Sequence, residues 1–297
     1  LMAYRIAEDR RVALPVLVNL DGFYLSFTRE PVEIPDVDQA RAFLPPFQPV
    51  TSAFRASRPA AVGVAVLEGP TYSYFRYQMH QSMENVLKVH EEVANEFHRR
   101  FGRWHGTSES YRLDDAEIVL VMAGSFATKG KEAVDRWRAA GKRVGLLRLR
   151  LIRPRPVADL VAALRGRRAV GVVDQNLSPG VGGIHYQEIA AALYSCPDRP
   201  ARLRSFIGGL GGKQIGEAEF DHILATLEGP SSEEESTAPV LLLTEHEWGQ
   251  IEARLRTAAG PERMASLPWK ACASVRPPDD CMKNSFTPGI SPATCST

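Results

Sequence analysis

Closely spaced cysteines are missing from this sequence of 297 residues. None of its cysteines forms a C-x-x-C pair, and three of the four fall within the last 26 residues. Zinc and iron–sulfur sites usually show tightly spaced cysteine ligands. We therefore expect this chain to bind no metal through its cysteines, which are Cys196, Cys272, Cys281 and Cys295.

An excess of one charge and a long apolar run are also absent. The 36 basic and 35 acidic residues leave a net charge of +1, which favours neither nucleic acid nor an anionic membrane as a partner. No apolar run approaches the ~20 residues of a membrane-spanning helix, and the first residues lack the pattern of a signal peptide. We expect a cytoplasmic protein. Its 44% hydrophobic and 24% charged residues are typical of a globular chain.

An apolar run lies close to the amino terminus, where chains are often poorly ordered. Residues 16–20 are apolar except for Asn19, and the run stops at Asp21-Gly22. This pattern predicts a strand that is covered on both faces. Such a strand needs neighbours, and the short segment before it provides none. We therefore expect the chain to be part of a larger molecule that provides these neighbours.

A proline-rich connector and a long helix follow. Clustered prolines, among them Pro45 and Pro46, predict an irregular connector. Apolar residues then recur at intervals of three and four, which predicts a helix over residues 74–101, and Gly102 is suited to end it. We assign residues 36–110 to this connector and helix.

Strand and helix patterns alternate four times between residues 111 and 228. Such alternation favours a mostly parallel open sheet with helices on both faces, which is an α/β fold. Residues 111–228 suit one compact domain. The strands are predicted over residues 116–123, 143–151, 169–173 and 203–207, each followed by a helix.

Residues 229–297 have a different character. Residues 230–237 have the charge and polarity of a solvated linker. One more helix is predicted over residues 240–259. The remainder has little apolar periodicity, and we expect it to be disordered.

Two glycine-rich stretches come close to phosphate-binding motifs. Residues 180–183 follow a strand and precede a helix, so their amides could meet a phosphate. His185, however, stands where the dinucleotide fingerprint has its third glycine. A tight structural turn is the favoured interpretation, and nucleotide binding is the alternative. Residues 208–213 lack the first glycine and the final Ser or Thr of a phosphate loop, so we reject that interpretation.

A few polar residues fall at positions where ligands often bind. Asp174 and His185 lie at the rim where open α/β sheets bind ligands, although an aspartate at a strand end is also a common turn former. Ser125 is not in a G-x-S-x-G elbow, and we expect its side chain to cap the next helix. Three histidines on the long helix share no single face and are expected to be solvated: His80, His90 and His98.

A series of motifs runs in order through residues 3–227. They are Pro15-Val-Leu-Val-Asn-Leu-Asp-Gly-Phe, Ser26, Glu30-Pro-Val-Glu-Ile-Pro, Leu44-Pro-Pro-Phe, Phe75-Arg-Tyr-Gln-Met-His-Gln-Ser-Met-Glu-Asn, Phe101-Gly-Arg, Gly145-Leu-Leu-Arg-Leu-Arg, Val173-Asp-Gln-Asn and Phe206-Ile-Gly-Gly-Leu-Gly-Gly. Together they closely resemble the alpha subunit of the pyruvate:ferredoxin oxidoreductases, a 2-oxoacid:ferredoxin oxidoreductase family.

The resemblance implies a place in a catalytic assembly. Residues 1–35 look like the end of a thiamine-pyrophosphate pyrimidine-binding domain, and residues 111–228 look like the carboxyl-terminal domain of transketolases. The family's reaction, pyruvate synthase chemistry, converts pyruvate and coenzyme A to acetyl-coenzyme A and carbon dioxide and reduces ferredoxin. The choice of pyruvate over another 2-oxoacid rests on the resemblance alone.

The same resemblance implies that most of the active centre lies outside these residues. The acidic residue that protonates the cofactor and the substrate contacts would lie in the missing early part of the first domain, and the remaining sites in other subunits or domains. Thiamine pyrophosphate, magnesium and iron–sulfur clusters belong to the assembled complex, with beta, gamma and delta subunits or equivalent domains as partners. We expect this chain alone to bind none of these cofactors and to be inactive, and we assign it no catalytic, cofactor-binding or metal residue. A non-catalytic docking or regulatory α/β module of such a complex is the alternative.

Three residues are candidates for contacts near the cofactor domain or between domains. Asp21, Gly22 and Ser26 follow the carboxyl end of the strand expected over residues 16–20, where ligands of open sheets bind. A turn that redirects the chain into the connector is the competing interpretation, because Asp-Gly is suited to turns.

Overall fold

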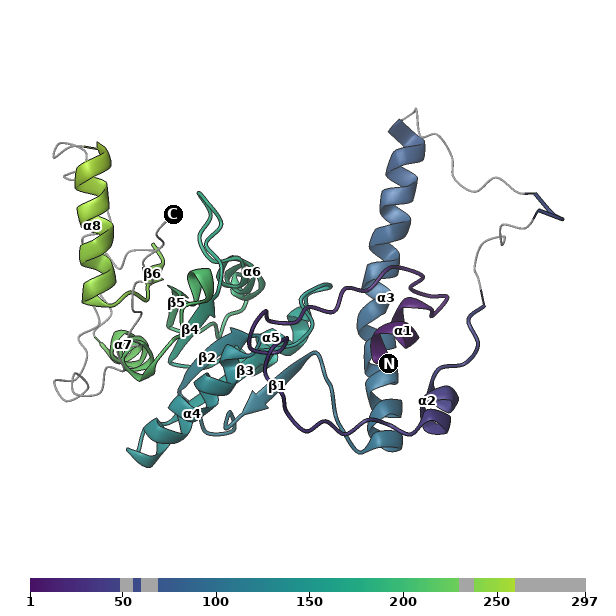
Figure 1. The fold of residues 1–297 in the computed structure, drawn as a ribbon, viewed down its shortest axis with the longest axis horizontal. Coiled ribbons are helices and arrows are strands. Elements are labelled where there is room, and N and C mark those ends of the chain that lie inside the picture. The colour runs from purple at the N-terminus through teal and green to yellow at the C-terminus, as the bar shows by residue number, and fades with distance from the viewer. Residues whose placement is uncertain (49–55, 60–68, 230–237, 260–297) are drawn as a thin grey trace, which may run out of the picture.

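The centre of the structure is a six-stranded, mostly parallel sheet (Figure 1). The computed structural model describes residues 1–48, 56–59, 69–229 and 238–259. The strand order is β1-β3-β2-β4-β5-β6, and each neighbouring pair is parallel except β1 with β3. The strands are β1 (Ser108–Tyr111), β2 (Ile118–Ala123), β3 (Val144–Leu149), β4 (Ala169–Asp174), β5 (Arg202–Ile207) and β6 (Val240–Leu241).

Helices cover both faces of this sheet (Figure 1). One face packs against α4 (Phe126–Ala139) and α7 (Glu217–Glu228), and the other against α5 (Val157–Leu164) and α6 (Ile184–Leu193). The predicted fold class, a mostly parallel open α/β sheet with helices on both faces, is confirmed.

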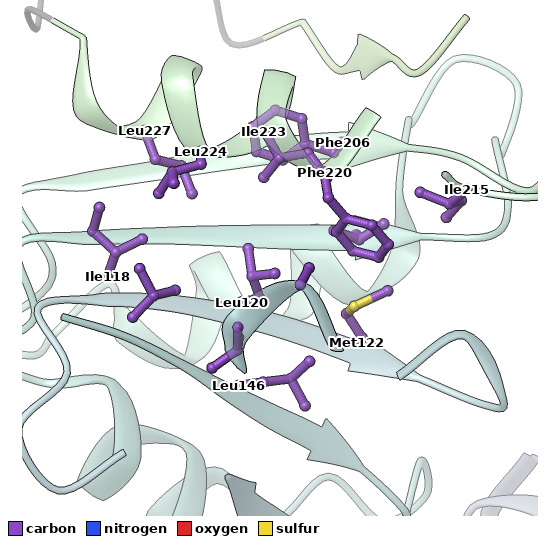
Figure 2. Close-up of a cluster of buried hydrophobic side chains, with 14 of the residues drawn as sticks. Ile118, Leu120, Met122, Leu146, Phe206, Ile215, Phe220, Ile223, Leu224 and Leu227 are labelled. Carbon is purple, nitrogen blue, oxygen red and sulfur yellow. The ribbon is translucent and has the colours of Figure 1, made fainter. Parts of the chain in front are cut away.

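The larger of the two apolar layers lies between the sheet and α7 (Figure 2). Leu120 of β2 and Ile223 of α7 are completely buried there. Each such side chain contributes about 1.5–3 kcal/mol to folding relative to exposure. Gly171 of β4 lets the helix approach closely, because a Cβ at this position would lie 2.9 Å from Leu227 Cδ1.

The predicted strands and helices between residues 111 and 228 are confirmed, and the strand ends differ from prediction by no more than two residues. The edge strand β1 was not predicted. It has only four residues, Ser-Glu-Ser-Tyr, which are mostly polar and only partly buried, so its sequence carries no apolar signal.

The amino-terminal part of the chain packs on a long helix, α3 (Gly69–Phe101). This confirms the helix predicted over residues 74–101 and extends it toward the amino end. Gly102, with φ of +69°, follows it as expected. Two helices were not predicted: α1 (Met2–Ala7), which packs on α3, and α2 (Val37–Phe43), which lies within the expected irregular connector.

Phenylalanines hold α2 against α3. The ring centroid of Phe43 lies 5.5 Å from that of Phe97 and 5.7 Å from that of Phe101. Asp36 caps α2, because its carboxylate accepts hydrogen bonds from the amides of Asp38 and Gln39. The cap explains why a short helix persists so close to clustered prolines.

The strand predicted over residues 16–20 is wrong. These residues belong to no strand or helix, and Leu17 and Leu20 are 88% and 70% exposed. A strand needs a neighbour for its backbone hydrogen bonds, and the described residues place none beside this run. The apolar pattern alone does not show whether such a neighbour exists.

The helix predicted over residues 240–259 is confirmed only in its second part. Its first residues form β6 beside β5, and α8 (Glu245–Ala259) follows. The linker at residues 230–237 and the tail from residue 260 lie outside the described residues. The domain limits at residues 35, 110 and 228 stay predictions. Within the described ranges, no helix combines the length and the apolar character needed to cross a membrane.

Candidate functional site

The sheet has a topological switch point between β2 and β4. From β2 the chain continues through α4 to β3 on one side, and from β4 it continues through α6 to β5 on the other. Open α/β sheets bind ligands at the carboxyl ends of the strands at such a point. Gly124 and Ser125 follow β2 here, and Asp174 ends β4. This edge is therefore the place to look for a site.

Asp21 reaches the switch point from the amino-terminal segment. Its Oδ2 accepts a 2.5 Å hydrogen bond from the amide of Ser125. Gly124, with φ of +70°, makes room for the carboxylate, because a Cβ there would lie 2.9 Å from Asp21 Oδ2. Beside this contact the rings of Tyr24 and Phe126 meet edge to face, with centroids 5.5 Å apart. A carboxylate at the amino end of α4 is also favoured by the helix dipole.

The other two predicted residues of this segment behave differently. Gly22 and Ser26 are exposed, and Ser26 Oγ accepts a hydrogen bond from Phe23 N within the same turn. The structure thus brings Asp21 to the sheet and places Gly22 and Ser26 in the turn that follows. Sequence reasoning missed Tyr24, and no local pattern marks it, because its partner Phe126 lies in a separate element.

The expected capping role of Ser125 is wrong. Its side chain makes no cap hydrogen bond to α4. Ser125 has φ of −71° and ψ of −28°, which are helical angles, whereas a capping residue usually has extended ones. The carboxylate of Asp21 binds the amide of Ser125 instead.

Asp174 fills the neighbouring position at the amino end of α6. Its carboxylate is fully buried and accepts hydrogen bonds of 2.8 Å from His185 N and 3.1 Å from Tyr186 N. Gly183 leaves room for it, because any side chain there would overlap Asp174 Oδ2. The glycine turn at residues 180–183 thus places its following amides on an internal carboxylate. This geometry supports the structural interpretation over nucleotide binding.

Two arginines lie beside Asp174. Arg153 and Arg155 both form ion pairs with Glu188. Burial lowers the pKa of Arg155 to about 10; the charge of Arg153 also lowers it, and that of Asp174 opposes the shift. The two guanidinium charges are matched in number by the carboxylates of Asp174 and Glu188, although the guanidinium nitrogens of Arg155 are buried and make no hydrogen bond with the described residues.

His185 of this group is held toward its neutral form. Its pKa is lowered mainly by burial, and the charges of Arg155 and Arg153 add to the effect against the attraction of Asp174. Its Nδ1 is buried and has no hydrogen-bond partner among the described residues. The structure thus brings Asp174 and His185 together at the predicted edge of the sheet, where the amide of His185 donates to the carboxylate of Asp174.

Lys213 closes the second glycine-rich stretch, and the structure shows what it binds. Its Nζ donates to Leu242 O at 2.9 Å and lies 2.7 Å from Glu247 Oε2 and 3.1 Å from Glu219 Oε1. A phosphate-loop lysine would need its charge free for a phosphate. Here two carboxylates neutralise it, which agrees with the rejection of a phosphate loop.

The expectation that all three helix histidines are solvated is wrong for His90. His90 is 8% exposed, whereas His80 forms an exposed pair with Glu84. The pKa of His90 is lowered, mainly by burial; nearby Asp159 raises it and His105 lowers it further.

The described amino-terminal residues were searched for groups that could hold thiamine diphosphate. Such a site needs free donors for a diphosphate and ligands for a divalent metal. A cavity of about 410 Å³ lies beside α1. Its arginines already have partners, because Arg11 pairs with Asp9 and Glu92, and Arg10 donates to Gln48. Among the described residues, no group of three or more His, Cys, Asp or Glu side chains is placed to hold a metal.

Two family models match the chain in succession. Residues 1–95 match the model described as pyruvate flavodoxin/ferredoxin oxidoreductase, thiamine diphosphate-binding. Residues 116–220 match the model described as pyruvate:ferredoxin oxidoreductase core domain II. The contact between Asp21 and Ser125 therefore joins the two matched regions.

Curated relatives match over most of the chain. Pyruvate synthase subunit PorA of Methanothermobacter thermautotrophicus is 40% identical over 230 residues, which is 77% of this chain and 58% of the relative. Ketoisovalerate oxidoreductase subunit VorA of Pyrococcus horikoshii is 36% identical over 216 residues, 72% of this chain and 54% of the relative. The chain thus spans somewhat more than half the length of these relatives.

Among solved structures, one match is a 2-oxoglutarate:ferredoxin oxidoreductase from Magnetococcus marinus with 2-oxoglutarate, coenzyme A and succinyl-CoA bound. It has a TM-score of 0.36 and 18% sequence identity, and it covers 55% of this chain and 24% of the other.

Proposed function

The chain belongs to the pyruvate:ferredoxin oxidoreductase family, and from this we propose that it forms part of the alpha subunit of an enzyme that oxidises pyruvate. The reaction takes pyruvate and coenzyme A to acetyl-coenzyme A and carbon dioxide, and passes the electrons to ferredoxin. The observation that carries this proposal is the ordered match of two family models to residues 1–95 and 116–220, supported by 40% identity to a pyruvate synthase subunit.

Within that enzyme we assign this chain a positioning role and place the bond-breaking groups elsewhere in the assembly. The two positions at its switch point that could receive a ligand's anionic group are occupied by Asp21 and Asp174. Among the described residues, no group of three or more His, Cys, Asp or Glu side chains is placed to hold a metal. We therefore place thiamine diphosphate, magnesium and iron–sulfur clusters in the assembled enzyme and expect the chain alone to bind none.

The relatives' names identify them as subunits, so we propose that this chain works with further subunits, among them the partners that carry electrons to ferredoxin. The substrate is proposed as pyruvate over a branched 2-oxoacid. Support for pyruvate comes from the names of the relatives, which include pyruvate synthase subunits from several organisms. Identity alone does not separate the substrates, because the pyruvate synthase and ketoisovalerate subunits of Pyrococcus horikoshii are 35% and 36% identical to this chain.

A chimera tests this function directly. The matching 230 residues of the Methanothermobacter thermautotrophicus subunit are replaced by those of this chain, and the chimera is assembled with the other subunits of that enzyme. We expect reduction of a viologen dye that depends on both pyruvate and coenzyme A, and slower reduction with 2-oxoisovalerate. The control chimera carries Leu120→Asp, which places a charge in the sheet core and is expected to be inactive.

The outcomes separate the possibilities. A chimera that folds and assembles but shows no turnover with any 2-oxoacid contradicts the proposal. Faster turnover with 2-oxoisovalerate than with pyruvate contradicts the substrate. In a separate calorimetric titration, the isolated chain should give no heat with thiamine diphosphate and Mg²⁺, and binding there would contradict the positioning role.

A non-catalytic docking module of such a complex is the second candidate. The internally filled switch point favours it, because a sheet edge closed by its own carboxylates is suited to carry contacts and not substrates. A complex that forms with this chain but reaches full turnover without it would favour this alternative.

A further inference from the structure

We infer that Asp21 is a positioning residue, which fixes the thiamine-domain part of the chain on the amino end of α4. The inference rests on the proposed function and adds to it the residue through which the two matched regions are held together. Asp21 lies in the region that matches the thiamine diphosphate-binding model, and Ser125 in the region that matches core domain II.

The contact has the features of a specific anchor. The hydrogen bond from Ser125 N to Asp21 Oδ2 is partly buried and joins residues 104 positions apart in the chain. Gly124 accommodates the carboxylate with a left-handed backbone, φ of +70°, that glycine adopts readily. A larger residue at Gly124 would approach the carboxylate to 2.9 Å, so both sides of the contact depend on their residue type.

The surroundings of Asp21 show why a single residue can matter here. Neighbouring apolar side chains are largely exposed, including Leu20 at 70% and Phe23 at 75%. Tyr24 is less exposed than these, at 37%, and its ring packs on Phe126. The segment is therefore held by Asp21 and Tyr24 at one point, and loss of the carboxylate removes the directional part of the attachment.

The position of Asp21 also favours a charged hydrogen-bond acceptor. Its carboxylate accepts from a backbone amide at the amino end of a 14-residue helix, where the dipole favours a negative charge. Asparagine could still accept this hydrogen bond but would bring no charge. Alanine could do neither. Replacing Asp21 by Asn thus removes only the charge, and replacing it by Ala removes the charge and the hydrogen bond, while the fold is expected to stay the same.

The experiment compares Asp21→Ala, Asp21→Asn and a matched control, Asp36→Ala. Asp36 also accepts from backbone amides at a helix start, but it caps α2 within its own segment. Two measurements are made. The first is hydrogen exchange at Ser125 in the full chain, and the second is the dependence of pyruvate turnover on thiamine diphosphate in the assembled enzyme.

For Asp21→Ala we expect hydrogen exchange at Ser125 to accelerate about tenfold, because loss of a capping interaction weakens a helix end by about that factor. The concentration of thiamine diphosphate that gives half-maximal turnover should rise about three- to tenfold for the same reason. Turnover at saturating cofactor should stay unchanged, because Asp21 does not take part in the chemistry. Asp21→Asn should recover part of both effects, and Asp36→Ala should match the wild type.

Unchanged exchange at Ser125 in Asp21→Ala overturns the contact. Faster exchange with an unchanged cofactor dependence overturns the positioning role, because the contact would then serve stability alone. A drop in saturating turnover without a shift in half-saturation also overturns it. Absence of turnover in the wild-type assembly is a separate result, which would contradict the proposed function and therefore also the positioning role. The hydrogen-exchange measurement would still test the contact between Asp21 and Ser125.

Discussion

Asp174 and Gly183 lie so close together that the backbone of Gly183 leaves space for the carboxylate and for nothing else. The arrangement lets Asp174 accept from two amides of α6 while completely buried. Packing therefore explains Gly183, whereas Gly180 and Gly182 adopt the positive φ angles, +77° and +93°, that glycine favours. The resemblance of this turn to a phosphate-binding turn thus has a structural cause.

Gly183→Ala should destabilise the chain by about 1–3 kcal/mol, because the new methyl group either overlaps the carboxylate or displaces it from its two hydrogen bonds. Urea unfolding followed by circular dichroism measures this. Gly249→Ala is the matched control: Gly249 lies in α8 with open space around it, and alanine should be neutral or slightly stabilising there. Equal stability of the two variants would contradict the packing argument.

Leu120→Ala should cost about 2–5 kcal/mol of unfolding free energy, because Leu120 is fully buried between the sheet and α7 and its truncation leaves a cavity. The control is Val157→Ala at a position that is 46% exposed, where the change should be within about 0.5 kcal/mol. Chemical unfolding of both variants checks this, and a small effect at Leu120 would mean that the described core is wrong.

Stability should fall in mild acid, in part because of His90. Burial lowers the pKa of His90 in the folded chain, so the unfolded chain takes up the proton first as the pH falls below the ordinary value of about 6.5. The stability that His90 contributes is thus fully present above that pH and is lost below it. Other groups near His90 are Asp159, which raises the pKa, and His105, which lowers it.

The measurement compares the unfolding free energy at about pH 7.5 and about pH 5.5. His90→Phe should reduce the difference between the two conditions. His80→Phe, an exposed position on the same helix, should leave the difference as in the wild type. An unchanged pH dependence in His90→Phe would show that His90 is not buried in its neutral form.

Lys213→Met should destabilise the chain by about 1–3 kcal/mol and accelerate hydrogen exchange in α8, because it leaves the largely buried Glu219 without its cation and frees Glu247. The control Lys142→Met breaks a more exposed pair with Glu228 and should cost about 0–1 kcal/mol. Titration of the wild type with inorganic phosphate should give no heat. Phosphate binding that Lys213→Met abolishes would restore the phosphate-loop interpretation.

The sheet could be predicted from the sequence because its signals are local. β2 is a continuous apolar run, and Gly124 and Gly141 mark the ends of β2 and α4 with positive φ angles. Parallel strands that are buried on both faces carry this pattern, which is clearest in β2 and β4, so these strands can be predicted without knowing which strands they pair with.

The rest depended on contacts between distant residues. The run at residues 16–20 has the pattern of a buried strand, but pairing depends on a neighbour that no local pattern reveals. The contact from Asp21 to Ser125 joins two segments far apart in the chain. From the sequence, Asp21 is predicted to make a contact and Ser125 to cap a helix. Only the structure shows that the carboxylate of Asp21 accepts a hydrogen bond from the amide of Ser125.

The rate of pyruvate-dependent ferredoxin reduction, measured with the complete enzyme, with the enzyme lacking this chain and with this chain alone, tests the central claim most directly. The account predicts turnover only in the complete assembly, and none in either incomplete sample. Equal rates with and without the chain, or turnover by the chain on its own, would contradict it.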